Sequence, residues 1–245
     1  MTRDTGPAHT LLELLWRHEL PPRRGGRGPR QTVSVDEVVT AAIGLADRTG
    51  YATVSVRAVA AELGLRPMSL YTYVPSKEAL TILMVDAVAF EDTPISPDLP
   101  IRDRLTAVAR QIRDEFLAHP WLLEVPAWRM VLGPGRMRRY ERQLAAVDGS
   151  GLDDVAMDRV IAVLSQFATG NARTALAAAH SAREQSDADW WDAYGPALAQ
   201  MMPAADFPLS TRVGAVVGEL YRAPGDPAGD FEFGLQRLID GILPG

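Results

Sequence analysis

The sequence contains no cysteine, a single lysine (Lys77) and no long apolar run. The absence of cysteine excludes disulfides, thiolate zinc sites and a cysteine nucleophile, and it fits a reducing compartment. No stretch approaches the roughly 18–20 consecutive apolar residues that cross a bilayer, and the chain does not open with a cationic segment followed by an apolar one. We therefore expect a cytoplasmic protein without a membrane partner.

Motifs of enzyme and metal sites are also missing. The four histidines form no HxxxH or HxE pair, and the sequence has no G-x-S-x-G, no P-loop and no strand-associated G-x-G-x-x-G. Gly133-Pro134-Gly135 is typical of a turn rather than of a phosphate-binding loop. We expect no catalytic residues, no cofactor and no resident metal, and leave open whether a metal accompanies a bound small molecule.

The net charge of −6 is unevenly distributed along the chain. Residues 1–90 hold ten basic and nine acidic side chains, whereas residues 91–245 hold fifteen and twenty-two. Residues 20–35 contain no acid and carry Arg23, Arg24, Arg27 and Arg30. This basic arm either contacts nucleic acid or is a solvated linker, and the acidic C-terminal part cannot itself favour a phosphate backbone.

Apolar residues recur at helical spacing throughout, with no hairpin or βαβ pattern, which predicts an all-α fold. A capping box at Ser34–Glu37 begins a helix that Gly50 ends. Further helices are expected at 55–63, from Pro67 onward, at 77–90, 101–119, 135–147, 153–183, 187–202 with an interruption at Gly195-Pro196, 211–221 and 230–243. Prolines and glycine break 120–134 into short helices, and three prolines make 92–100 a linker.

Residues 55–77 have the pattern of a helix-turn-helix, whose second helix enters the DNA major groove. Ala60 is small where the helices must approach, Gly64 can take a positive φ, and Leu70 and Val74 face inward. We expect the outer surface to carry Pro67, Met68, Ser69, Tyr71, Thr72 and Tyr73. Phenols on such a face suit phosphates, and small residues suit base edges.

Lys77 lies at the start of the next helix, where the helix dipole disfavours a cation. A phosphate contact explains its position better than a plain surface role does. For the neighbouring residues the alternatives are a core role for Tyr71 or Tyr73 and a plain surface role for Arg57.

The sequence resembles the TetR family of bacterial regulators. The resemblance covers about 33–90 and lies in Val54-Ser55-Val56-Arg57-x-Val59-Ala60-x-x-Leu63-Gly64 and in Leu70-Tyr71-x-Tyr73-Val74-x-x-Lys77-x-x-Leu80. The ending Phe231-Glu232-Phe233-Gly234-Leu235 looks like the C-terminal domain of the tetracycline-repressor branch. The resemblance implies that Ser55 and Arg57 open the second helix at the DNA. It also implies base contacts by Pro67, Met68 and Ser69, and phosphate contacts by Tyr71, Tyr73 and Lys77.

Three regions follow from these patterns. They are an N-terminal extension with the basic arm (1–32), a three-helix helix-turn-helix DNA-binding domain (33–91) and a larger helical domain for ligand binding and dimerisation (101–245). Apolar walls with a few polar groups are the usual composition of a small-molecule site. The candidates, for each of which ordinary core packing is the alternative, are Phe116, Trp121, Trp128, Met130, Phe167, Asn171 and His180.

We therefore predict a homodimeric, ligand-responsive repressor that binds a palindromic double-stranded operator and is released by a small-molecule effector. Two-fold operators match two-fold proteins, and the helices at 153–183 and 230–243 would pair with their symmetry mates. An effector would shift the population away from the DNA-competent form. The alternatives are an effector-independent activator and a helical ligand-binding or interaction protein with a degenerate head.

Overall fold

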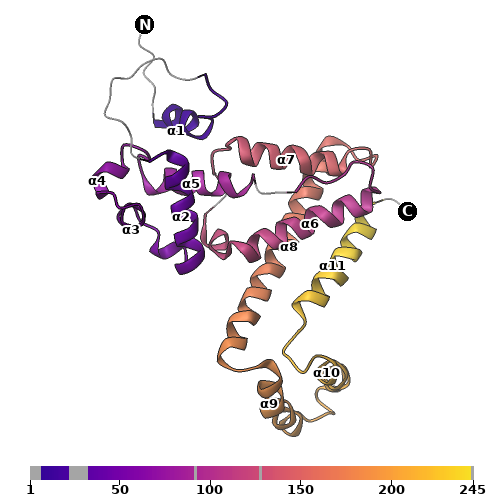
Figure 1. Cartoon of the computed structure of the whole chain (residues 1–245). Helices are drawn as coiled ribbons and strands as arrows, with labels where there is room; N and C mark the ends of the chain where they lie inside the picture. The colour runs from indigo at the N-terminus through magenta and orange to yellow at the C-terminus, as the bar shows by residue number, and fades with distance from the viewer. Residues whose placement is uncertain (1–6, 22–32, 91–92, 127–128, 244–245) are drawn as a thin grey trace.

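The computed structural model describes residues 7–21, 33–90, 93–126 and 129–243 (Figure 1). Within these ranges the chain forms α-helices and two short 3-10 helices and has no strand, which confirms the all-α prediction. None of the described helices is both long and apolar enough to cross a membrane.

The N-terminal unit, called the head below, consists of α2 (Val35–Thr49), α3 (Val56–Glu62), α4 (Pro67–Leu70) and α5 (Lys77–Val88). The capping box that begins α2 is confirmed, because Ser34 Oγ accepts from the Glu37 amide at 3.1 Å and the Glu37 carboxylate accepts from the Ser34 amide at 2.6 Å. Ser55 and Ser76 cap α3 and α5 with their hydroxyl oxygens alone, which accept from the amides of Ala58 and Ala79 at 3.1 Å each. These caps satisfy amides that a helix leaves unpaired at its first turn.

The four helices enclose one apolar core. Leu15 of α1 (Pro7–Leu15) and Trp121 of the 3-10 helix η2 (Pro120–Glu124) complete it from outside the head. The deepest side chains are Val38, Ala42, Val59, Ala60, Leu70, Leu80 and Met84. Because α1 and η2 both contribute to this core, the head does not fold around its own helices alone.

The C-terminal domain is built on α6 (Ile101–Ala118), α7 (Pro134–Val147), α8 (Asp154–Glu184) and α11 (Pro227–Ile242). α6 and α11 both pack along α8 (Figure 1). Their shared core contains Leu105, Val108, Ile112, Ile161, Leu164, Phe231, Leu235 and Ile239. The prediction of short helices across 120–134 is only partly right, because η2 is a 3-10 helix and residues 129–133 are not helical.

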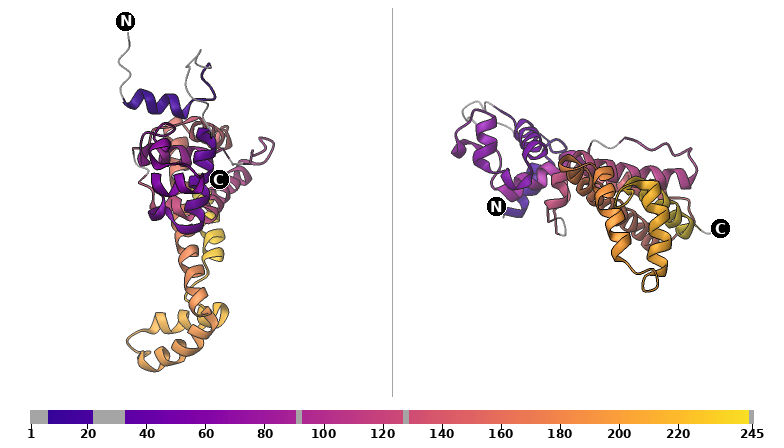
Figure 2. Two further views of the ribbon diagram at one scale, coloured as in Figure 1. Left: turned by 60° about the vertical axis from the view of Figure 1, so that its left-hand side comes forward. Right: turned by 90° about the horizontal axis from the view of Figure 1, so that it is seen from below.

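A hairpin of α9 (Asp187–Met201) and α10 (Pro208–Tyr221) projects away from the rest of the chain (Figures 1 and 2). Its helices meet where Trp191 packs on Gly218, at which a Cβ would lie 2.1 Å from the indole. The predicted interruption at Gly195-Pro196 is wrong, since α9 continues through Pro196. Pro196 is exposed, so solvent can satisfy the carbonyl that lacks an amide partner.

The head and the C-terminal domain are joined at a buried carboxylate. Asp86 of α5 is 4% exposed and accepts from the backbone amides of Gly135, at 3.1 Å, and Arg136, at 2.9 Å. A Cβ on Gly135 would lie 2.0 Å from the Asp86 carbonyl oxygen. Glycine is therefore required where α7 begins, and the anion suits the positive end of that helix.

Candidate functional site

The helix-turn-helix is formed by α3, a tight turn and α4. Gly64 adopts φ +65°, which favours glycine, and the Leu65 amide donates to the Ala60 carbonyl at 2.8 Å across the turn. Ala60 and Leu70 are fully buried between the helices. The roles predicted for Ala60, Gly64 and Leu70 are confirmed in this geometry.

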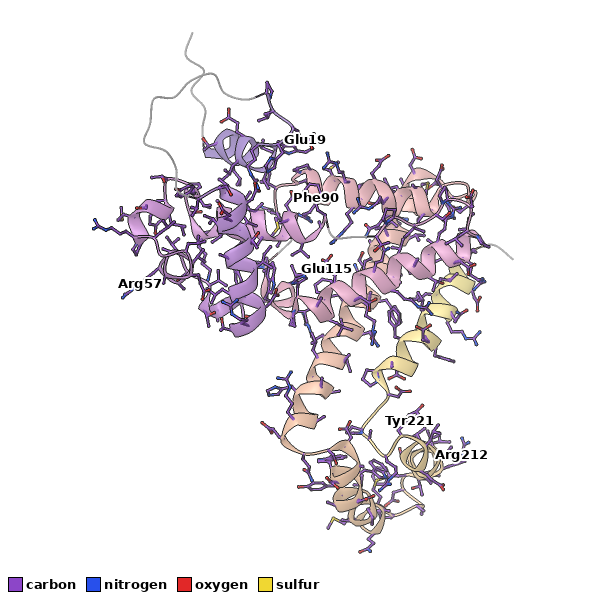
Figure 3. All side chains as sticks on the ribbon, in the orientation of Figure 1. Glu19, Arg57, Phe90, Glu115, Arg212 and Tyr221 are labelled. Carbon is purple, nitrogen blue, oxygen red and sulfur yellow. The ribbon has the colours of Figure 1, made fainter. Side chains whose placement is uncertain are left out.

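The outer face of this unit carries most of the residues predicted to meet DNA. Met68 is 75% exposed and Tyr71 is 48% exposed, and Arg57 projects from the edge of the head into solvent (Figure 3). The predicted residues that are exposed here are Ser55, Arg57, Pro67, Met68, Ser69, Tyr71 and Thr72. A surface with a guanidinium, a phenol, hydroxyls and one flexible apolar side chain can contact both phosphates and base edges.

Tyr73 does not lie on that surface. Its side chain is only 7% exposed and belongs to the core of the head, so the predicted outward placement is wrong. α4 ends at Leu70, and the next residues turn, with the Tyr73 amide donating to the Leu70 carbonyl at 2.9 Å. Because residues 71–73 form a turn, helical spacing no longer predicts the direction of the Tyr73 side chain. Tyr73 lies beside a groove that is also lined by residues of α1.

Lys77 lies at the first residue of α5 with its ammonium 4.5 Å from the ring centre of Tyr51. The Tyr51 hydroxyl lies 2.9 Å from Thr81 Oγ1, which itself donates to the Lys77 carbonyl at 2.9 Å, so Tyr51 is the donor to Thr81. The cation–π contact holds the ammonium at the disfavoured end of the helix. Sequence reasoning missed Tyr51, because nothing in the sequence pairs it with Lys77.

Arg66 was also missed. It is exposed and forms the N-cap of α4, directly before Pro67. A basic residue in the turn of a helix-turn-helix was a usable signal, because the turn lies close to the DNA backbone. The four arginines of the basic arm lie outside the described residues.

A cavity of about 470 Å³ lies between α5, α6, α7 and α8. Of the residues predicted for a ligand site, Phe116 lines it. Its apolar wall consists of Val85, Ile112, Phe116, Leu122, Val125 and Leu132, and its polar wall of Glu115, Arg136, Arg139, Tyr140, Gln143, Ser165 and Thr169.

The charged groups of this cavity are not equivalent. Arg139 forms an ion pair with Glu115, and both side chains are largely buried. Arg136 keeps a buried nitrogen, Nη1, that has no hydrogen-bond partner among the described residues. Burial lowers the pKa of the Arg136 guanidinium from its ordinary value, although Asp86 nearby opposes that shift.

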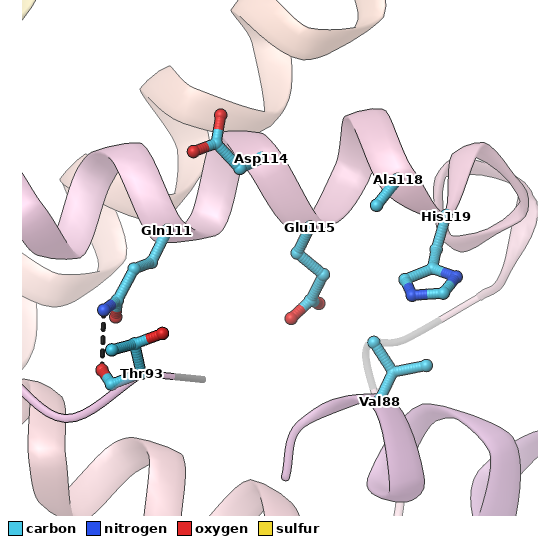
Figure 4. Close-up of a pocket in the computed structure, with 7 residues that line it drawn as sticks. All are labelled: Val88, Thr93, Gln111, Asp114, Glu115, Ala118 and His119. Carbon is cyan, nitrogen blue, oxygen red and sulfur yellow. Dashed lines mark hydrogen bonds between the residues drawn. The ribbon is translucent and has the colours of Figure 1, made fainter. Parts of the chain in front are cut away.

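A smaller pocket of about 270 Å³ lies beside α6, where the side chains of Gln111, Glu115 and His119 point toward Thr93 and Val88 (Figure 4). Gln111 Nε2 donates to the Thr93 carbonyl at 2.7 Å across it. Glu115 lines both this pocket and the larger cavity.

Two family models match the chain. The model described as "Bacterial regulatory proteins, tetR family" matches residues 38–83, and the model described as "Tetracyclin repressor-like, C-terminal domain" matches residues 93–244. The chain belongs to the TetR family. The two matched ranges coincide with the head and the C-terminal domain.

Relatives of this TetR-family chain are transcriptional regulators. The HTH-type transcriptional repressor DrrR1 of Streptomyces coeruleorubidus is 37% identical over 98% of this chain and 87% of its own length. The structure of the Streptomyces coelicolor TetR family protein ActR with actinorhodin has a TM-score of 0.72 at 27% identity, covering 86% of this chain and 95% of that one. ActR with (S)-DNPA has a TM-score of 0.67 at 28% identity, covering 87% and 98%. The chain is a DNA-binding transcriptional regulator.

Most other residues predicted for a ligand site in this TetR-family chain do not line the large cavity. Trp121 is buried in the head core and donates to Asp47 Oδ1 at 2.8 Å. Phe167 stacks on Phe231 with ring centres 5.4 Å apart. Met130 is half-buried away from the cavity lining. The apolar character of Trp121 and Phe167 is explained by the two cores, which these residues help to form.

Asn171, another residue predicted for the ligand site, instead links three helices through hydrogen bonds. Its Oδ1 accepts from Arg113 Nε and its Nδ2 donates to the Pro227 carbonyl, both at 2.7 Å. It thereby joins α6, α8 and the start of α11, which accounts for a polar residue in an apolar helix. His180 is exposed on the outer half of α8, and Trp128 lies outside the described residues.

Proposed function

We propose that this regulator is a homodimeric repressor that binds a palindromic operator and releases it when a small-molecule effector occupies the 470 Å³ cavity. The similarity to DrrR1, a transcriptional repressor, supports repression. The two ActR complexes, with actinorhodin and with (S)-DNPA, support a small-molecule effector. The observation that carries the proposal is the buried Asp86, which joins α5 of the head to α7, a helix that lines the cavity.

The DNA contacts divide by chemistry. Met68, with Pro67 and Ser69, forms the part of α4 that would face base edges, where an apolar side chain can meet a thymine methyl group. The phosphate contacts would come from Ser55, Arg57, Arg66, Tyr71 and Lys77. Tyr73 is left out of this interface because its ring is covered.

The coupling between cavity and DNA would pass through α5 and α7. Arg136 contributes its guanidinium to the cavity and its backbone amide to Asp86. Asp86 is on the helix that begins at Lys77, beside the DNA-reading surface. An occupant that moves Arg136 therefore acts on the anchor of α5, and it would favour a head arrangement with lower operator affinity.

A second copy of this chain is the partner that the α9–α10 hairpin fits. Nearly half of the large apolar side chains that the described residues expose lie on this hairpin. They are Trp190, Tyr194, Leu198, Met201, Phe207, Leu209, Val213, Val216, Leu220 and Tyr221. Phe233 of α11 is exposed as well. A gathering of exposed large apolar side chains marks an interaction site, and a palindromic operator requires two heads.

A gel shift against the DNA that flanks the protein's own gene tests the DNA-binding face. The double variant Arg57→Ala/Tyr71→Phe is expected to weaken binding. Loss of the Arg57 charge should lower the slope of log affinity against log salt by about 1, whereas loss of the uncharged Tyr71 hydroxyl should lower the affinity alone. Arg159→Ala, an exposed arginine of α8 far from the head, is the charge control and should leave both unchanged. Equal binding by the double variant and wild type would contradict the assigned face.

A promoter fusion tests repression. Co-expression of the wild-type protein is expected to lower reporter output from the flanking promoter, and the double variant should restore it. Higher output with the wild-type protein would instead identify an activator.

A further inference from the structure

Arg136 is the one charged group of the large cavity for which the described residues supply no ion-pair partner. The Arg139 guanidinium is taken by Glu115. The two carboxylate oxygens of Asp86 accept from the backbone amides of Gly135 and Arg136. The nearest acid is therefore already engaged by main-chain donors, and Arg136 Nη1 is left buried without an acceptor.

A buried donor without an acceptor is unfavourable, and more so when it is charged. Such a group calls for an acceptor, which a water, an ion or a ligand can supply. Arg17 Nε and Arg104 Nε are also unpaired among the described residues, but of the three side chains only that of Arg136 lines the cavity. The lining of the cavity carries two arginines and one glutamate. The buried Asp86 carboxylate offsets part of the Arg136 charge but gives Nη1 no acceptor, so an acidic oxygen of a ligand would supply the acceptor that is missing. The apolar part of the lining includes the ring of Phe116.

We infer that the effector is an organic anion, with a carboxylate or similar acidic oxygen group on an apolar ring system, and that Arg136 recognises the acidic group. The inference rests on the proposed effector cavity. A guanidinium presents a planar fork of donors that matches two acidic oxygens. Val85, Ile112 and Phe116 would contact the apolar body of the same ligand.

The groove within the α9–α10 hairpin has the opposite character. It is larger, about 710 Å³, and its charged residues are Asp192 and Glu219. Asp192 forms an ion pair with Arg222, and none of the described residues that line the groove is basic, so an organic anion finds a cationic partner at Arg136 and not in the groove. The charge of the lining therefore distinguishes the 470 Å³ cavity from the hairpin groove as a site for an anion, although both have large apolar areas.

A pair of fluorescent probes tests this separation. We would titrate the full-length protein with 8-anilinonaphthalene-1-sulfonate and with N-phenyl-1-naphthylamine, which has the same ring system without the acidic group. Arg136→Gln is expected to lower the affinity for the sulfonate probe by about tenfold, which is the usual contribution of a hydrogen bond to a charged group. The affinity for the uncharged probe should change by less than about twofold. Arg138→Gln, which removes an exposed charge on the same helix, is the control and should change neither.

Two further variants make the outcomes distinguishable. Ser165→Trp fills the cavity and should abolish most binding of both probes; if it affects neither, the effector cavity itself is wrong, and the inference falls with it. If Ser165→Trp blocks both probes but Arg136→Gln weakens them equally or not at all, the cavity stands and the anionic class is overturned. Arg136→Lys keeps the charge, so it should retain tighter sulfonate binding than Arg136→Gln. Equal sulfonate affinity of Arg136→Lys and Arg136→Gln would also overturn the inference. If Arg136→Gln folds poorly, Arg136→Met takes its place in the same comparison.

Discussion

Lys77 has two candidate partners at the surface of the head. One is the ring of Tyr51 beneath its ammonium, and the other is a DNA phosphate on the solvent side. The ring contact orients the ammonium but leaves part of it open, since the residue is half-exposed. A cation that is held at a helix start and directed outward loses little conformational entropy when it meets a phosphate.

Replacing Lys77 by Gln should therefore weaken operator binding several-fold and lower the salt slope by about 1. Titrations at several salt concentrations measure both. Arg237→Gln is the matched control, because Arg237 also lies over an aromatic ring, that of Phe233, but on α11. Loss of thermal stability without any change of salt slope would show that Lys77 serves packing alone.

At the level of residues, local rules made some placements predictable. Ser34, Ser55 and Gly64 depend on a few neighbouring positions, so their caps and positive φ followed from the sequence. Tyr73 did not, because its burial depends on α1 and on a turn that ends helical spacing. Arg136 was missed for a similar reason, since a cavity is assembled from helices far apart in sequence.

Among the elements, the contact between α5 and α7 is the one that ties the two parts of the molecule together. One buried carboxylate satisfies two amides at the start of α7, and Arg142 Nη2 donates to the Ala89 carbonyl at 3.2 Å near the end of α5. The N-terminal segment adds a third tie, because Trp16 Nε1 donates to the carbonyl of Leu132, a residue of the cavity wall. The start of α7 is thus held from two sides.

Asp86→Asn should loosen this junction. An asparagine oxygen can accept one of the two amides, but its amino group would face the other donor. We expect a loss of about 1–3 kcal/mol in the free energy of unfolding, measured by urea denaturation, and weaker release of the operator by effector. Asp158→Asn, which alters an exposed hydrogen bond from Tyr140, should cost far less. Equal stability of the two variants would contradict the importance of the junction.

Helix positions followed from the sequence more readily than helix contacts. Apolar spacing and capping residues located α2, α6, α7, α8 and α11 to within a few residues. The expected interruption at Pro196 was wrong because the sequence does not show that Pro196 lies on a solvent-exposed face of α9, where a proline can be tolerated. The 3-10 form of η2 could not be predicted either, because its Trp121 packs into the core of the head, a contact with residues far away in the sequence.

At the scale of the whole molecule, the exposed apolar hairpin predicts the oligomeric state. Val216→Glu/Leu220→Glu places two charges on the outer surface of α10 and should convert a dimer to a monomer in light scattering, with a loss of operator affinity. Gln200→Glu adds a charge at an exposed polar position of α9 and should leave the dimer intact. A double variant that stays dimeric would move the interface elsewhere, to α8 and α11.

The length of α8 has a mechanical consequence. The helix has 31 residues, so it is roughly 46 Å long, and its cavity-lining residues Ser165 and Thr169 lie near its middle. A tilt of about 5° at Thr169 would displace its far end by roughly 2 Å, given the rise of about 1.5 Å per residue. That end carries the hairpin. In the proposed dimer, α8 would therefore act as a lever whose pivot is the proposed effector cavity, so that a ligand in one subunit would be felt by the other.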